Sequence, residues 1–155
     1  MTVSTINAPS ASFSTAVTTV ISQAITGGSI AAGSMFEFRV RAQVINTTAA
    51  SNLVATISIG ATNVIVATQA LGATARASPG QPVIIEGTIS FSSATAAEAT
   101  VRAFTSSAVA FDTGFGTSAA VTVVTATNTT ADIKLNTSAA TSTVIVREAR
   151  IVRIK

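Results

Sequence analysis

The residues that most often carry out chemistry in proteins are scarce in this sequence. Histidine and cysteine are both missing from its 155 residues. Without an imidazole or a thiolate, Ser-His-Asp and Cys-His catalysis and the usual zinc sites are excluded. The lack of cysteine also rules out disulfides, which fits a reducing compartment.

The carboxylates are spread singly along the chain. The sequence contains six of them, at Glu37, Glu86, Glu98, Asp112, Asp132 and Glu148. A general acid/base pair would have to be assembled from distant residues by folding. We therefore predict that the protein is not an enzyme and that it holds no cofactor and no metal.

One tripeptide matches a catalytic motif. Asp112-Thr113-Gly114 has the sequence found in aspartic proteases, where two such carboxylates share a proton and activate water. Only one copy is present, and the bulky Phe115 follows it, so we interpret the tripeptide as a turn. The surrounding loop, residues 109–118, carries Phe111 and Phe115 among polar residues. We expect these phenylalanines either to cover the core or to contact another subunit.

The net charge is concentrated at the C-terminal end. The basic residues there are Arg147, Arg150, Arg153 and Lys155. Offset by Glu148, they carry +3, which equals the formal net charge of the whole chain. This end can be a solvated strand, a surface that docks onto an acidic protein, or a nucleic-acid contact. No Tyr or Trp is present to stack on bases, which argues against nucleic acid and leaves the solvated strand and the protein contact open. The candidate interaction residues are these four basic residues and the two phenylalanines.

The elements that must position these residues are β-strands. The clearest is Met35 to Asn46, where apolar Phe36 and Phe38 begin one face and Glu37 and Arg39 begin the other, because strand side chains alternate. Each buried phenylalanine stabilises the fold by roughly 1.5–3 kcal/mol. We expect this strand to anchor the core and to lie beside the strand predicted at 82–92.

The same patterns extend along the chain. They predict eight main strands, at 15–26, 35–46, 53–59, 64–70, 82–92, 98–107, 129–137 and 143–154. Imperfect alternation predicts β-bulges near Val20 and Glu148, and Gly60 to Asn63 predicts a hairpin turn. Short strands without helices indicate an all-β fold, which we predict to be a single jelly-roll-like antiparallel β-sandwich of about eight strands. An immunoglobulin-like sandwich is the alternative, although no cysteine pair or tryptophan favours it.

The domain organisation is simple. We predict one sandwich domain at residues 15–155, preceded by a flexible arm at residues 1–14 with a short extended piece at 2–7. No apolar run approaches the roughly 20 residues of a membrane helix, and the start of the chain lacks a basic segment followed by an apolar core. We expect no membrane partner and synthesis in a cytoplasm.

Three segments carry a resemblance to a known group. They are Thr19–Ser22, the Ile30–Ala42 stretch with its Ala-Ala-Gly-Ser turn and Arg-Val-Arg-Ala end, and Ile57–Thr62 with its Gly-Ala-Thr turn. With the strand from Gly80 to Phe91 and the apolar-basic end from Ser142 to Ile154, this series resembles small jelly-roll structural proteins of tailed bacteriophages.

The resemblance implies a virion protein that is made in the host cytoplasm. Such proteins are capsid decoration (cement) proteins or tail-fibre and spike modules. A chain without fibre-shaft repeats and without Trp or Tyr to stack on sugars favours decoration. The expected partners are then the protein itself, as a homotrimer, and the major capsid protein. A tail-fibre or receptor-binding module is the alternative, and a bacterial surface or pilus subunit would require an export signal.

Overall fold

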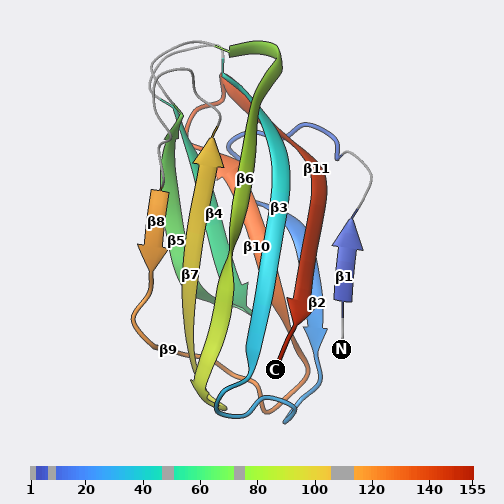
Figure 1. The fold of residues 1–155 in the computed structure, drawn as a ribbon, viewed down its shortest axis with the longest axis vertical. Helices are drawn as coiled ribbons and strands as arrows, with labels where there is room; N and C mark the ends of the chain where they lie inside the picture. The colour runs from blue at the N-terminus through green and yellow to red at the C-terminus, as the bar shows by residue number, and fades with distance from the viewer. Residues whose placement is uncertain (1–2, 7–9, 47–50, 72–75, 106–113) are drawn as a thin grey trace.

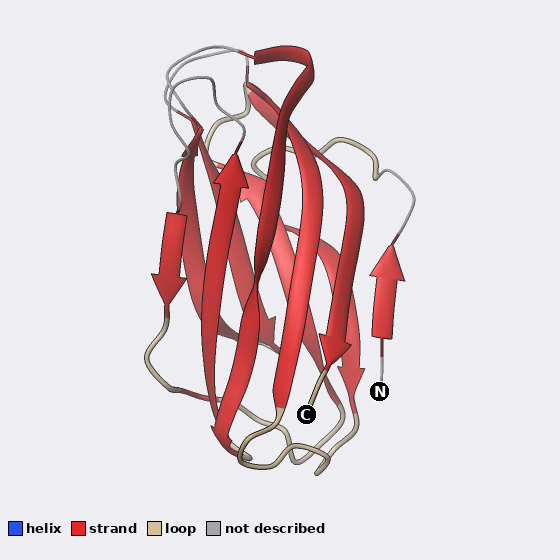
Figure 2. Ribbon diagram, in the orientation of Figure 1, coloured by secondary structure: helices blue, strands red, loops and turns tan. Residues whose placement is uncertain are grey.

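The structure is a computed structural model that describes residues 3–6, 10–46, 51–71, 76–105 and 114–155. Strands and their connections make up this described part, without a helix (Figure 2). The strands are β1 (Val3–Ile6), β2 (Thr18–Ile25), β3 (Met35–Asn46), β4 (Ser51–Ile59), β5 (Thr62–Leu71), β6 (Arg76–Ser93), β7 (Ala96–Thr105), β8 (Gly114–Thr117), β9 (Val121–Thr122), β10 (Thr129–Thr137) and β11 (Ser142–Arg153).

The strands form two antiparallel sheets that face each other (Figure 1). The larger sheet has seven strands in the order β1-β11-β3-β6-β7-β8, with β9 also paired to β7. The smaller sheet has four strands in the order β2-β10-β4-β5. The predicted fold class, an antiparallel β-sandwich, is confirmed, and each of the eight predicted main strands is present.

Successive strands often belong to different sheets. The β4–β5 and β6–β7 hairpins stay within one sheet, whereas β2–β3, β3–β4, β5–β6 and β10–β11 cross from one sheet to the other. At the β4–β5 hairpin, Ile59 pairs with Thr62, so Gly60 and Ala61 form the predicted turn, with Gly60 at a φ of 57°. Glycine suits this left-handed backbone because it has no Cβ to clash.

Strand β3 occupies the middle of the larger sheet, with β11 on one side and β6 on the other. The bounds of β3 match the prediction. Its pairing with β6, which contains the strand predicted at 82–92, also matches. Phe36 is 1% exposed, and its ring lies 6.1 Å from that of Phe91 on β6 in an edge-on arrangement. The apolar face of β3 therefore forms one wall of the core, and its polar face points away from the sandwich.

Two β-bulges reset the alternation at the predicted places. In β2, the pairing with β10 passes from Ile21 to Thr19 and leaves Val20 as the extra residue, so that Val20 and Ile21 are both buried. In β11, the pairing with β3 shifts between Val146 and Glu148, which makes Arg147 the extra residue. Because a bulge inserts one residue into one strand only, side chains on either side of it keep facing the core.

The N-terminal segment follows the edge of β11. Strand β1 pairs with β11 from Val3 opposite Val152 to Ile6 opposite Ala149. Further along, the Ser10 amide donates to the Val146 carbonyl over 2.9 Å, and Phe13 forms a bridge with Val144. The short extended piece predicted at residues 2–7 is present as β1, and the described residues 10–13 continue along β11 where a loose arm was predicted. The physical reason is that an uncovered β11 would leave a row of backbone donors and acceptors without partners.

One predicted loop contains a strand. Residues 109–118 were expected to form a loop, but β8 (Gly114–Thr117) pairs with β7 from Ala103 to Thr100. The loop prediction is wrong for these residues, because pairing with the edge of β7 outweighs the low strand propensity of two glycines. The short extra strand expected within residues 119–125 is present as β9.

Candidate interaction surface

Charged side chains gather on the outward face of the larger sheet. By strand alternation and register, this face carries Glu37, Arg39, Arg41, Glu86, Glu98, Arg102, Arg147, Glu148 and Arg150. On the outward face of the smaller sheet, the charged residues among those described are Asp132 and Lys134, which pair with each other at 4.0 Å. The two outward faces of the sandwich therefore differ strongly in charge density.

Arginines from three strands form a row across this face. Arg150 on β11 lies directly opposite Arg39 on β3, Arg39 lies opposite Glu86 on β6, and Glu86 lies opposite Arg102 on β7. Side chains at such positions have Cβ atoms about 4.5–5.5 Å apart and interact directly. We call Arg150, Arg39, Glu86 and Arg102 the arginine row.

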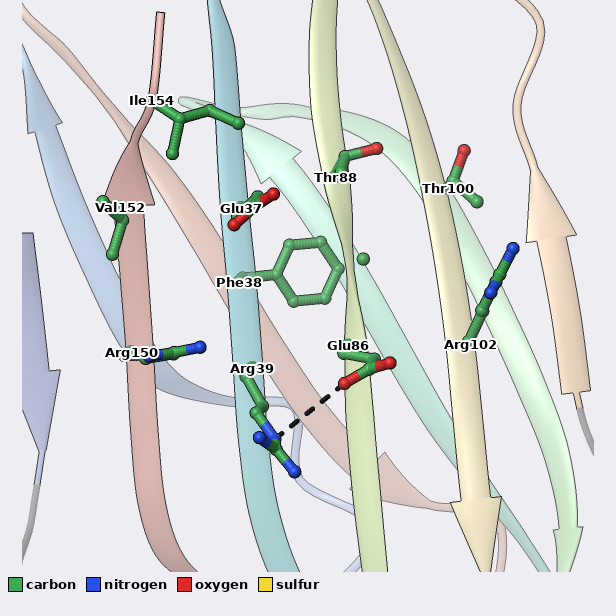
Figure 3. A pocket seen from close by; sticks show the side chains of 11 residues that line it. Glu37, Phe38, Arg39, Glu86, Thr88, Thr100, Arg102, Arg150, Val152 and Ile154 are labelled. Atoms are coloured by element: carbon green, nitrogen blue, oxygen red, sulfur yellow. Dashed lines mark ion pairs between the residues drawn. The ribbon is translucent and has the colours of Figure 1, made fainter.

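A groove runs along the arginine row and has a volume of about 540 Å³. Its second side is the adjacent cross-strand row of Val152, Glu37, Thr88 and Thr100, and Ile154 lies at one end. Figure 3 shows these side chains standing on neighbouring strands, with the Arg150 guanidinium directed towards β3. The groove is open to solvent along the sheet, so it fits an extended surface contact better than an enclosed small molecule.

The arginines of the row are unequally paired. The Arg39 Nε atom lies 3.9 Å from the Glu86 Oε2 atom. The Arg39 side chain is 42% exposed and the Glu86 side chain 40%. An exposed ion pair of this length contributes about 0–1 kcal/mol. The same Nε atom is shielded from solvent and has no hydrogen-bond partner. Within the described part of the chain, Arg150 forms neither an ion pair nor a side-chain hydrogen bond.

The floor of the groove depends on a glycine. A methyl group at Gly87 would overlap the Thr100 carbonyl oxygen and would lie 2.7 Å from the Cζ atom of Phe38. The Phe38 ring extends from β3 towards β6 (Figure 3), and it occupies the place that a side chain at position 87 would need. A glycine within a strand often marks such a close approach.

The structure separates the four basic residues of the C-terminal end. Arg150 faces the groove, while Arg147, at the bulge, donates from Nε to the Gln43 Oε1 atom over 2.7 Å. Arg153 donates from Nη2 to the Ser29 carbonyl over 2.6 Å, and its guanidinium carbon lies 5.9 Å from the centre of the Phe36 ring. Lys155 is exposed at the end of the chain. These residues do not form one patch.

The two phenylalanines are placed only in part. Phe111 lies outside the described residues, and Phe115 is a residue of β8 opposite Arg102 in the register. Whether they cover the core or contact another subunit stays a prediction.

Sequence reasoning missed Arg39, Glu86 and Arg102 as members of a site. The signal that was available is the charged face of the 35–46 strand, which must meet either water or a partner. Alternation places Arg39 on that face, but only the cross-strand register brings it beside Arg150 and Glu86.

Other classes of site receive no support from the described residues. No group of carboxylates among them could hold a metal ion, and they include no helix with the length and apolar character that a membrane span requires. Comparisons with known protein families, with curated proteins and with solved structures find no match to this chain.

Proposed function

We propose that this chain is a structural protein of a tailed-bacteriophage virion, a decoration protein that binds the capsid surface as a homotrimer and stabilises the shell. The observation that carries the proposal is the concentration of charge on the outward face of the larger sheet, around an open groove. The resemblance of the sequence to small phage structural proteins supplies the virion context.

The face has the composition of a protein contact surface. Arginine is enriched at protein–protein interfaces, where its planar guanidinium can engage two acceptors at once. Here arginines from three strands stand on a rigid sheet, which keeps their spacing fixed and reduces the entropy lost on binding. A rigid, charged and shallow surface suits adhesion to another large protein.

Avidity would convert weak contacts into stable decoration. A single groove of this kind binds modestly, because exposed charged contacts are screened by solvent. Three linked copies on neighbouring capsid subunits would raise the overall affinity by about 10²–10⁴. The linked contacts would resist outward pressure on the shell without any chemical step.

A tail-fibre or receptor-binding module is the second candidate. Arg39 and Glu86, side by side in an open groove, offer the donors and acceptors that bind sugar hydroxyls. The sequence lacks the Trp and Tyr that usually stack on sugar rings, which favours the capsid.

The test is co-sedimentation of the purified protein with expanded, undecorated capsids of the phage whose genome carries the gene. We expect the wild-type protein to bind, and the Arg39→Glu/Arg150→Glu variant to lose binding. Lys134→Glu, which changes charge on the opposite sheet, is the matched control and should bind as wild type. Protein that ignores capsids but binds host cells would overturn decoration in favour of the receptor-binding module.

A further inference from the structure

We propose that the groove along the arginine row binds an extended acidic segment of a partner protein, with Arg39 and Arg150 together holding an Asp or Glu carboxylate. This inference rests on the proposed function, since it names the chemistry of the partner that the outward face contacts.

Two like charges lie side by side in the groove. Arg150 and Arg39 lie directly opposite each other on adjacent strands, an arrangement that is destabilising in isolation. Glu86 lies on the far side of Arg39, opposite Arg102, and not between the two arginines. A carboxylate placed between Arg39 and Arg150 would turn this repulsion into two charge-assisted contacts.

The two guanidinium groups have hydrogen-bonding capacity that no acceptor in the described residues uses. Within the described residues, the Arg39 guanidinium donates no hydrogen bond and has only the 3.9 Å ion pair with Glu86, and the Arg150 guanidinium makes no ion pair. Figure 3 shows Arg150 directed across the groove towards the strand that carries Arg39. Both groups can therefore accept a ligand without first breaking a strong internal contact.

The groove walls combine apolar side chains with hydroxyl groups. Val152 and Ile154 give one end an apolar surface, and Ile154 is 46% exposed. Thr88 and Thr100 supply hydroxyls towards the other side. A peptide in which acidic and apolar residues alternate would place its carboxylate over the arginines and an apolar side chain against Val152 and Ile154.

The acidic residues of the groove argue against a nucleic acid. Glu37 and Glu86 line the same groove as the arginines, so a continuous phosphate backbone would meet like charge at two points. A peptide with spaced carboxylates can place them over the arginines and away from Glu37 and Glu86. The mixture of charges thus selects a partner with discrete acidic groups.

The test uses the full-length protein and a fluorescein-labelled peptide in which Asp alternates with Val, followed by fluorescence anisotropy. We expect this peptide to bind about tenfold more tightly than its Asn-Val counterpart, and the difference to shrink as salt rises to about 0.15 M. Arg39→Gln and Arg150→Gln should each weaken binding about five- to tenfold. Two variants serve as matched controls: Arg147→Gln lies on the same face outside the groove, and Lys134→Gln lies on the opposite sheet; both should bind within about twofold of wild type.

Several outcomes would overturn the inference. They are equal binding of the two peptides, full binding by both groove variants, or binding of a single-stranded oligonucleotide as tight as that of the acidic peptide. Circular dichroism melting of each variant checks that it is folded.

The result is separable from that of the proposed function. If the Arg39→Gln/Arg150→Gln protein still decorates capsids, the groove inference fails and decoration stands. If the acidic peptide binds as described but capsids are ignored, decoration fails and the groove inference stands.

Discussion

At the scale of single residues, the basic residues of the C-terminal end have two different roles. Arg153 is part of the fold, because it joins the Ser29 carbonyl to the Phe36 ring. Arg150 projects into the groove and contacts no acidic partner in the described part of the chain. The sequence presents both as equivalent cations of one strand, and only their packing separates them.

We therefore predict opposite effects of two matched substitutions. Arg153→Ala should lower the free energy of unfolding by about 1–2 kcal/mol, since a charged hydrogen bond and a cation–π contact are both lost. Arg150→Ala should leave it unchanged or raise it by up to about 0.5 kcal/mol, because the repulsion with Arg39 disappears. Urea denaturation measures both values, and equal destabilisation by the two changes would contradict the assignment.

Gly87 is the second residue whose role can be tested alone. Gly87→Ala should destabilise the protein by at least about 1–3 kcal/mol, because the new methyl group overlaps the Thr100 carbonyl and presses on Phe38. Thr88→Ala, at the next position of the same strand, should change stability by less than about 0.5 kcal/mol. If thermal unfolding shows the two variants to be alike, the close approach at Gly87 does not limit the fold.

At the scale of elements, the N-terminal segment is a cover for the edge of β11. Without Val3–Ile6 and residues 10–13, the backbone edge of a twelve-residue strand would face solvent along the larger sheet. Exposed edges of this length pair readily with other chains. The segment thus protects the sheet against unwanted association.

Deletion of residues 1–13 should therefore lower stability and cause concentration-dependent association, which light scattering after size exclusion would detect. A synthetic peptide of residues 1–13, added in trans, should restore the original size by occupying the same edge. A truncated protein that keeps the wild-type size and melting temperature would show that the β11 edge needs no cover.

Much of this element-level description follows from local pattern. Alternation gave the bounds of β3 and the bulges at Val20 and Arg147, since each depends only on which neighbouring side chains are apolar. The side-chain pattern did not predict β8, because its two glycines give no strand signal and the strand depends on pairing with β7. It also failed to bring Arg39, Glu86 and Arg150 together, because the order of strands in a sheet is set by long-range packing and not by local alternation.

At the scale of the whole molecule, most contacts join residues that are far apart in the sequence, and the first strand pairs with the last. Folds dominated by such contacts close long loops before they gain stabilising interactions. We predict refolding on a time scale of about milliseconds to seconds, without the microsecond phase of a helical bundle. Stopped-flow fluorescence with a dye placed on Lys155 measures this rate, and refolding that is complete within the mixing time would contradict the prediction.

The bulge at Arg147 adds one residue to β11 without changing which side chains of this strand face the core. Val146 and Ala149 both face the core, although three positions separate them in the sequence, because the extra residue is absorbed outside the ladder. Removal of codon 147 would restore a plain alternation in which Glu148 and Arg150 still point outward. A chain without residue 147 would therefore keep the same side chains in the groove and in the core.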